Sequence, residues 1–219
     1  MINMSRFTKV QRYIKTHIEE LYKYIYDSVN IDFNNDFVQN QHLDVFQKFL
    51  HIWEQHYSHL GIPADKVLQK DTLLKAIEKI KIVVVNSSKD SDKLDYSGVN
   101  RVIAIGGLAL SRGLTLKGLM TSYFYRNTAT YDVLLQMGRW FGYRNGYDDL
   151  CQIWAARDSI ENYKEISIAT EELKDDLKRM FENKLTPKEF GIRVRDESDK
   201  LQITAANKMR HAFNVIDHI

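Results

Sequence analysis

The chain has 219 residues, of which 44% are hydrophobic, and its formal net charge is +2. This content supports one sizeable core with at most a smaller appendage, and the near-neutral balance excludes a polycation, so any contact with nucleic acid must come from a local patch. The single cysteine, Cys151, excludes an internal disulfide and a zinc site built from several cysteines.

The first predicted elements are a strand over residues 1–6 and an amphipathic helix over residues 8–26. Because the strand begins without a lead-in, we expect the chain to be a piece of a longer protein. Thr8 and Gln11 have the spacing of a capping box, which predicts the helix start, and apolar residues then recur at helical spacing. The polar, asparagine-rich stretch 27–40 is predicted to be a loop.

Two further helical segments follow. Apolar and aromatic residues recur at helical spacing over residues 43–60, and Gly61 ends the stripe. A shorter helix is predicted near residues 73–80. Together these segments predict a helical insertion at about residues 28–78.

Four apolar runs then predict strands, the first of them a β-branched run typical of a strand covered on both faces. They lie at residues 82–86, 102–105, 120–125 and 151–155, with a helix at about 130–141 between the last two. Strands that interleave with helical segments predict an α/β fold with a mostly parallel sheet.

The last third of the chain is predicted to be helical. Thr170 is placed to cap a helix that has carboxylates in its first turn, and Thr186 begins a second capping box. We therefore divide the chain into an α/β domain over residues 1–165 and a helical C-terminal extension over residues 166–219.

A glycine-bearing loop follows the strand at residues 102–105. In open parallel sheets, ligands gather at the carboxyl ends of the strands. Residues 106–119 supply four glycines that let the backbone approach a ligand, and Ser111, Arg112 and Thr115 add hydrogen-bond donors. Taken alone, this segment could also be a connection of no special role.

The most specific motif lies on the helix at about 130–141 and just after it. Gln136 and Arg139 stand three residues apart and so share a helix face, and Arg144 follows beyond Gly142. Arginines held this way suit the stabilisation of charge on a phosphoryl group during transfer. Solvated arginines on a surface helix are the alternative, which fits poorly with the three aromatic residues that stand between the two arginines.

The order of these elements resembles the second RecA-like domain of superfamily-two helicases. The run 111–119 looks like the fifth helicase motif, and the run 136–144 looks like the sixth motif, which carries arginine fingers. Residues 1–6 resemble the strand of the fourth motif, and residues 82–88 the strand after it. The resemblance implies a three-layer RecA-like fold, of the kind shared by P-loop NTPases.

Some positions depart from the helicase pattern. One residue separates Gln136 from Gly138 where helicases have two, and the final arginine stands one place later, so Arg139 is a closer match than Arg144. Gly107 stands where helicases usually have a threonine that contacts nucleic acid.

A closer resemblance is to the Z-one (Z1) domain of bacterial proteins described as endonucleases. It rests on the runs 4–11, 110–116 and 136–144 and on the Thr-Pro-x-x-Phe run at 186–190, and it spans residues 1–210. The family implies a larger ATPase-like protein linked to DNA restriction or phage defence.

The resemblances imply roles for named residues. Arg139 and Arg144 would act as arginine fingers at the γ-phosphate of ATP, and Gln136 would help to orient that contact. The residues expected at the nucleotide are Gly113, Thr115 and Gly138. The residues expected at nucleic acid are Ser5, Arg6, Ser87, Ser88, Ser111 and Arg112. The first four lie at strand ends and are expected to contact the phosphate backbone.

No Gly-x-x-x-x-Gly-Lys-Ser/Thr phosphate loop occurs in the chain, although phosphoryl transfer needs a phosphate cradle and a metal ligand. We therefore expect the second half of a motor, whose partner is an N-terminal RecA-like domain of the same protein that binds ATP with magnesium. This chain alone should bind no cofactor and hydrolyse no ATP. DNA is the expected second partner.

No apolar run approaches the roughly 18 residues that span a bilayer, and the first residues lack the order of a signal peptide. A cytoplasmic protein without membrane contact is expected.

Two other functions stay open. The chain could cleave DNA itself, but metal-dependent nucleases need clustered carboxylates or histidines. The best candidates for metal ligands are His51, Glu54, His56 and His59. They share one helical segment and no second set of ligands accompanies them, so no metal site is predicted. The chain could instead be an α/β module that only docks partner proteins and ignores DNA.

Overall fold

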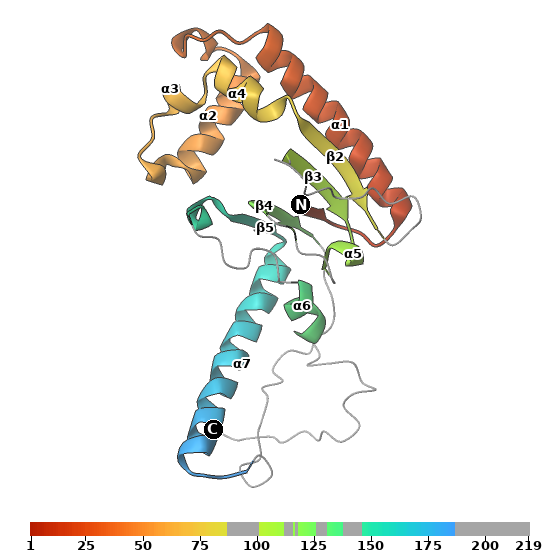
Figure 1. The fold of residues 1–219 in the computed structure, drawn as a ribbon, viewed down its shortest axis with the longest axis vertical. Coiled ribbons are helices and arrows are strands. Elements are labelled where there is room, and N and C mark those ends of the chain that lie inside the picture. The colour runs from red at the N-terminus through yellow and green to blue at the C-terminus, as the bar shows by residue number, and fades with distance from the viewer. Residues whose placement is uncertain (87–100, 112–115, 117, 126–130, 138–145, 187–219) are drawn as a thin grey trace.

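The computed structural model describes residues 1–86, 101–111, 116, 118–125, 131–137 and 146–186, with only the backbone at positions 108, 111, 131, 132 and 137. Within them, five strands form one sheet in the order β2-β3-β1-β4-β5 (Figure 1). The strands are β1 (Ile2–Asn3), β2 (Ile80–Val85), β3 (Arg101–Gly106), β4 (Thr121–Phe124) and β5 (Gln152–Ala155).

Every pairing in this sheet is parallel, which confirms the predicted α/β fold with a parallel sheet. The register aligns Ile2 with Ile105 on one side and with Tyr123 on the other. Parallel pairing brings the carboxyl ends of all five strands to one edge of the sheet, called the carboxyl edge below. This is the edge at which open α/β sheets bind ligands.

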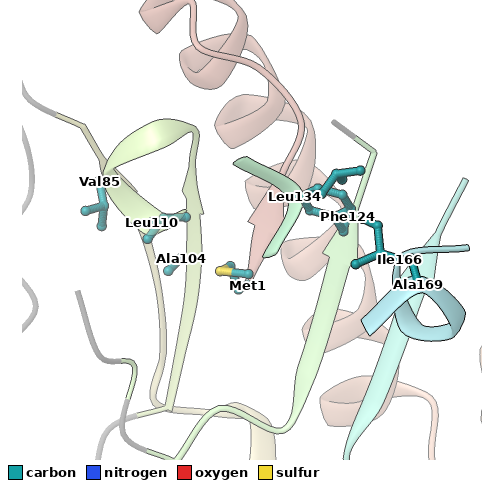
Figure 2. Close-up of a cluster of buried hydrophobic side chains, with 8 residues drawn as sticks. All are labelled: Met1, Val85, Ala104, Leu110, Phe124, Leu134, Ile166 and Ala169. Carbon is teal, nitrogen blue, oxygen red and sulfur yellow. The ribbon is translucent and has the colours of Figure 1, made fainter. Parts of the chain in front are cut away.

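Helices cover the sheet from both faces. The long helix α1 (Thr8–Ile31) packs along β2 and β3. The helices α5 (Leu108–Ser111), α6 (Tyr131–Met137) and α7 (Arg157–Glu182) share a core with the strands that includes no residue of α1. Figure 2 shows the buried side chains of this core: Met1, Val85, Ala104, Leu110, Phe124, Leu134, Ile166 and Ala169.

A second core lies in the helical insertion, at the far end of α1 (Figure 1). The insertion contains α2 (Asp44–His56), α3 (Ala64–Val67) and α4 (Lys70–Ile77), with 3₁₀ turns at Val38–Asn40 and Ser58–Leu60. The buried side chains of the second core are Val29, Phe33, Val45, Phe46, Leu68 and Leu73. Outside the insertion, a further 3₁₀ turn, Asp148–Leu150, precedes β5. The hydroxyl of Tyr22 donates to the carbonyl of Ile77 at 2.9 Å and ties α4 to α1.

The second core explains why α1 is longer than predicted. The helix continues beyond residue 26 to Ile31, so the first part of the predicted loop 27–40 is wrong. Val29 is fully buried in the second core, and this burial stabilises an extra turn that the polar local sequence does not favour.

Both predicted helix caps that fall on described residues are wrong. Phe7 is the N-cap of α1 without a side-chain cap bond, and the predicted partner of Thr8, Gln11, is buried elsewhere. Thr170 lies inside α7, where its hydroxyl donates to the carbonyl of Ile166 at 2.7 Å. The helix α7 runs continuously across the predicted division at residues 165 and 166, and the second capping box, at Thr186, extends outside the described residues.

None of the described helices is long and apolar enough to cross a membrane.

Candidate functional site

The structure describes three of the predicted site residues with their side chains: Ser5, Arg6 and Gln136. Ser111 is described by its backbone alone, as the last residue of α5. The remaining predicted site residues lie outside the described residues: Ser87, Ser88, Arg112, Gly113, Thr115, Gly138, Arg139 and Arg144.

A buried amide joins the segments that follow β1 and β2 at the carboxyl edge. Gln11 is 1% exposed, and its Nε2 donates to the carbonyl of Ser5 at 2.8 Å. Its Oε1 accepts a hydrogen bond from Nδ2 of Asn86 at 3.3 Å. The hydroxyl of Ser5 accepts a hydrogen bond from the backbone N–H of Phe7 at 3.1 Å. Because Gln11 bonds both segments, it fixes Ser5 relative to the end of β2.

The segment after β3 meets the same place through a glycine. A Cβ atom at Gly107 would lie 2.5 Å from the carbonyl oxygen of Ser5 and 3.1 Å from Cα of Arg6. Both distances involve backbone atoms, which cannot turn aside as a side chain can. A threonine, the residue that helicases usually have here, would therefore not fit without displacing the segment after β1. Glycine at 107 is thus required by close approach of two backbones.

These contacts bring together the ends of three strands that are separated in the sequence. Ser5, Asn86 and Gly107 follow β1, β2 and β3 respectively, and they meet around Gln11 and the carbonyl of Ser5. The predicted parallel sheet implies that the loops after these strands lie at one edge. It missed Gln11 as the residue that joins them, because a glutamine at the fourth helical position carries the signal of a cap.

Gln136 is exposed on α6, and α7 packs against this helix. The hydroxyl of Tyr163 on α7 donates to the carbonyl of Leu134 at 2.8 Å, and Leu134 is fully buried. The Tyr163 ring lies 6.4 Å from that of Phe124, centroid to centroid. Burial raises the pKa of Tyr163, so the hydroxyl stays protonated and keeps donating. The side of α6 that carries Gln136 is therefore presented outward from a fixed helix.

The histidine-bearing helix α2 is the best candidate for metal ligands in the sequence. Among the described side chains, no group of three or more His, Cys, Asp or Glu is arranged to hold a metal ion. His56 instead packs with an aromatic side chain: its ring lies 5.1 Å from that of Trp154 on β5, at an interplanar angle of 70°. This contact connects the end of α2 to the sheet.

The described part of the carboxyl edge offers a polar, backbone-rich surface. It presents the partly exposed Ser5 and the exposed Arg6, and Gln136 is exposed on α6. Hydroxyl, guanidinium and amide groups of this kind bind phosphates or orient a neighbouring group.

Comparison with known proteins gives one family. The family model of the Z1 domain matches residues 1–201 of the chain. No curated protein and no solved structure matches it.

Proposed function

We propose a function from the premise that this chain belongs to the Z1 domain family: it is the C-terminal motor domain of a nucleic-acid-dependent ATPase of the helicase kind. In this proposal the ATP and its magnesium ion are bound by an N-terminal RecA-like domain of the same protein. The present chain supplies arginine fingers and a surface for nucleic acid. The larger protein would act in DNA restriction or phage defence.

The observation that carries the proposal is the meeting of three strand ends at the carboxyl edge. Ser5, Asn86 and Gly107 come together there around one buried glutamine, on an all-parallel sheet. A motor domain needs such an edge, because nucleotide and nucleic acid must both be sensed by loops that move as one unit. The rigid joint at Gln11 supports that requirement.

The helix α6 supports the second part of the proposal. Gln136, the first residue of the arginine-bearing motif, is exposed on this helix, and Tyr163 fixes the helix against α7. In the proposal, Arg139 follows from this fixed helix toward the γ-phosphate and stabilises the charge that spreads over the phosphoryl oxygens during transfer. Arg144 contributes a second guanidinium.

The test is ATP hydrolysis by the protein in which this chain is joined to its ATP-binding domain. Arg139→Ala should lower kcat by about 1,000-fold or more, since arginine fingers contribute on that order. Binding of ATP should change little, because the phosphate cradle lies on the other domain. Arg139→Lys should not restore activity, since lysine lacks the planar fork of donors.

Arg179→Ala is the matched control. Arg179 is an exposed arginine in the last turn of α7, paired with Asp176 at 3.6 Å, and its loss should leave kcat unchanged. The 219-residue chain alone should hydrolyse no ATP. Turnover by this chain alone, abolished by Arg139→Ala, would refute the half-motor proposal, and so would an unchanged kcat in the joined protein.

A further inference from the structure

The first half of α1 carries charge of one sign. The first 18 residues of the chain contain four cations, Arg6, Lys9, Arg12 and Lys15, and no carboxylate. Residues 19–32 reverse the balance with four carboxylates and a single lysine, Lys23. Because the whole chain has a net charge of only +2, the beginning of α1 is a local positive patch of the kind that attracts a polyanion.

Aromatic rings are interleaved with these cations and are open to solvent. Phe7 is 60% exposed and Tyr13 is 66% exposed. The guanidinium carbon of Arg6 lies 5.1 Å from the Phe7 ring centroid. The ring of His17 lies 4.2 Å from that of Tyr13. Each exposed ring therefore has a cationic or imidazole side chain beside it.

Helical geometry places these side chains together. Lys9, Tyr13 and His17 follow at intervals of four residues, and Arg12 lies beside them, so they share the face of α1 that is turned from the sheet. The buried Gln11 lies on the opposite face. We define the basic-aromatic face as Arg6, Phe7, Lys9, Arg12, Tyr13 and His17.

This face is continuous with the carboxyl edge. Arg6 directly follows Ser5, whose carbonyl is held by Gln11 and approached by Gly107. Along the chain, no carboxylate lies between Ser5 and the end of this face at His17, and the first acidic residue is Glu19.

We propose that the basic-aromatic face binds single-stranded nucleic acid, with bases stacked on Phe7 and Tyr13 and phosphates beside Lys9 and Arg12. Exposed rings recognise a single strand, because its bases present open faces that a duplex hides. This inference rests on the proposed function, to which it adds the kind of track and the residues that contact its bases.

An anionic membrane is the other polyanion that a basic helix can bind. A helix that lies in a membrane separates an apolar face from a charged one. Here the apolar side of α1 is packed on the sheet, and the exposed rings alternate with Lys9 and Arg12. The interleaved pattern favours a nucleic acid, and vesicles form an arm of the test.

The experiment is fluorescence anisotropy with the 219-residue chain, a labelled oligothymidylate, the matching oligouridylate and a mixed-sequence duplex of equal length. Binding to single strands should exceed binding to the duplex. Phe7→Ala and Tyr13→Ala should each weaken single-strand binding by about tenfold and leave its salt dependence unchanged. Lys9→Gln and Arg12→Gln should each reduce the slope of log K against log salt by about 0.7.

Two variants in the acidic half of α1 are the controls. Tyr24→Ala removes a ring that is 53% exposed, and Lys23→Gln removes a cation, so neither should change binding. Tyr13→Trp should bind as the unchanged chain does, since tryptophan also stacks. Thermal unfolding of each variant checks that the fold is kept.

Three results would overturn the inference: no binding to single strands, binding that is indifferent to Phe7→Ala and Tyr13→Ala, or capture by phosphatidylserine vesicles that these substitutions abolish while oligonucleotides stay unbound. Each is distinguishable from failure of the proposed function. If Arg139 controls ATP turnover but the ring variants bind normally, the motor stands and the stacking surface is lost. If the rings bind single strands but Arg139 is dispensable, the stacking surface stands without the motor.

Discussion

Replacing Gln11 by methionine tests whether the carboxyl edge depends on one buried amide. Methionine nearly preserves the volume of glutamine but removes both hydrogen bonds, to the Ser5 carbonyl at 2.8 Å and from the Asn86 amide at 3.3 Å. A hydrogen bond contributes about 0.5–1.5 kcal/mol net, and a buried polar group that loses its partner costs more. With Gln11 1% exposed, we expect a loss of about 1–3 kcal/mol.

Thermal and urea unfolding measure this loss. For a chain of this size, a loss of about 2 kcal/mol lowers Tm by roughly 4–8 °C. Gln39→Met is a matched control: Gln39 also makes two side-chain hydrogen bonds, with Asn34 at 2.7 Å and Asp36 at 3.3 Å, but it is exposed. Its replacement should cost less than about 0.5 kcal/mol. Equal losses for the two variants would show that burial of the amide does not fix the edge.

Two further predictions concern the two ends of the parallel strands. Gly107→Ala should lower the free energy of unfolding by about 1–3 kcal/mol and weaken oligonucleotide binding, because the new Cβ would displace Ser5. Gly146→Ala is the control. A Cβ there meets nothing within 4 Å but φ is +86°, so this variant should lose stability without a change in binding. Equal binding by both variants would contradict this reasoning. In the 219-residue chain by itself, the free amine of Met1 should make stability rise from pH 6 to pH 8. Burial lowers the pKa of this amine from 8.0 to about 6, so the unfolded chain binds the proton more tightly in that window. The penalty, roughly 3 kcal/mol below pH 6 and absent above pH 8, should vanish when the amine is acetylated, which a comparison of urea unfolding at pH 5.5 and pH 8.5 for the two forms measures.

The sequence alone predicted the elements whose signal is a repeated pattern. The apolar runs at residues 82–86 and 102–105 gave strands β2 and β3, and the helical stripe at 43–60 gave α2 and the 3₁₀ turn after it. Buried positions recur at a fixed spacing along a strand or helix, so a window of about ten residues is enough to recognise the pattern. The parallel sheet followed from the alternation of these elements, and with it the gathering of loops at one edge.

The tertiary structure decided every feature that depends on a partner far along the chain. Local spacing made Gln11 a cap, whereas the fold buries it between Ser5 and Asn86, a residue 75 positions away. Val29 extends α1 because the insertion covers it, and Thr170 sits inside α7 because that helix has Ile166 and Ala169 in the sheet core. A cap signal extends over three or four residues, whereas burial of a polar or apolar side chain is set by whatever segment the topology brings beside it.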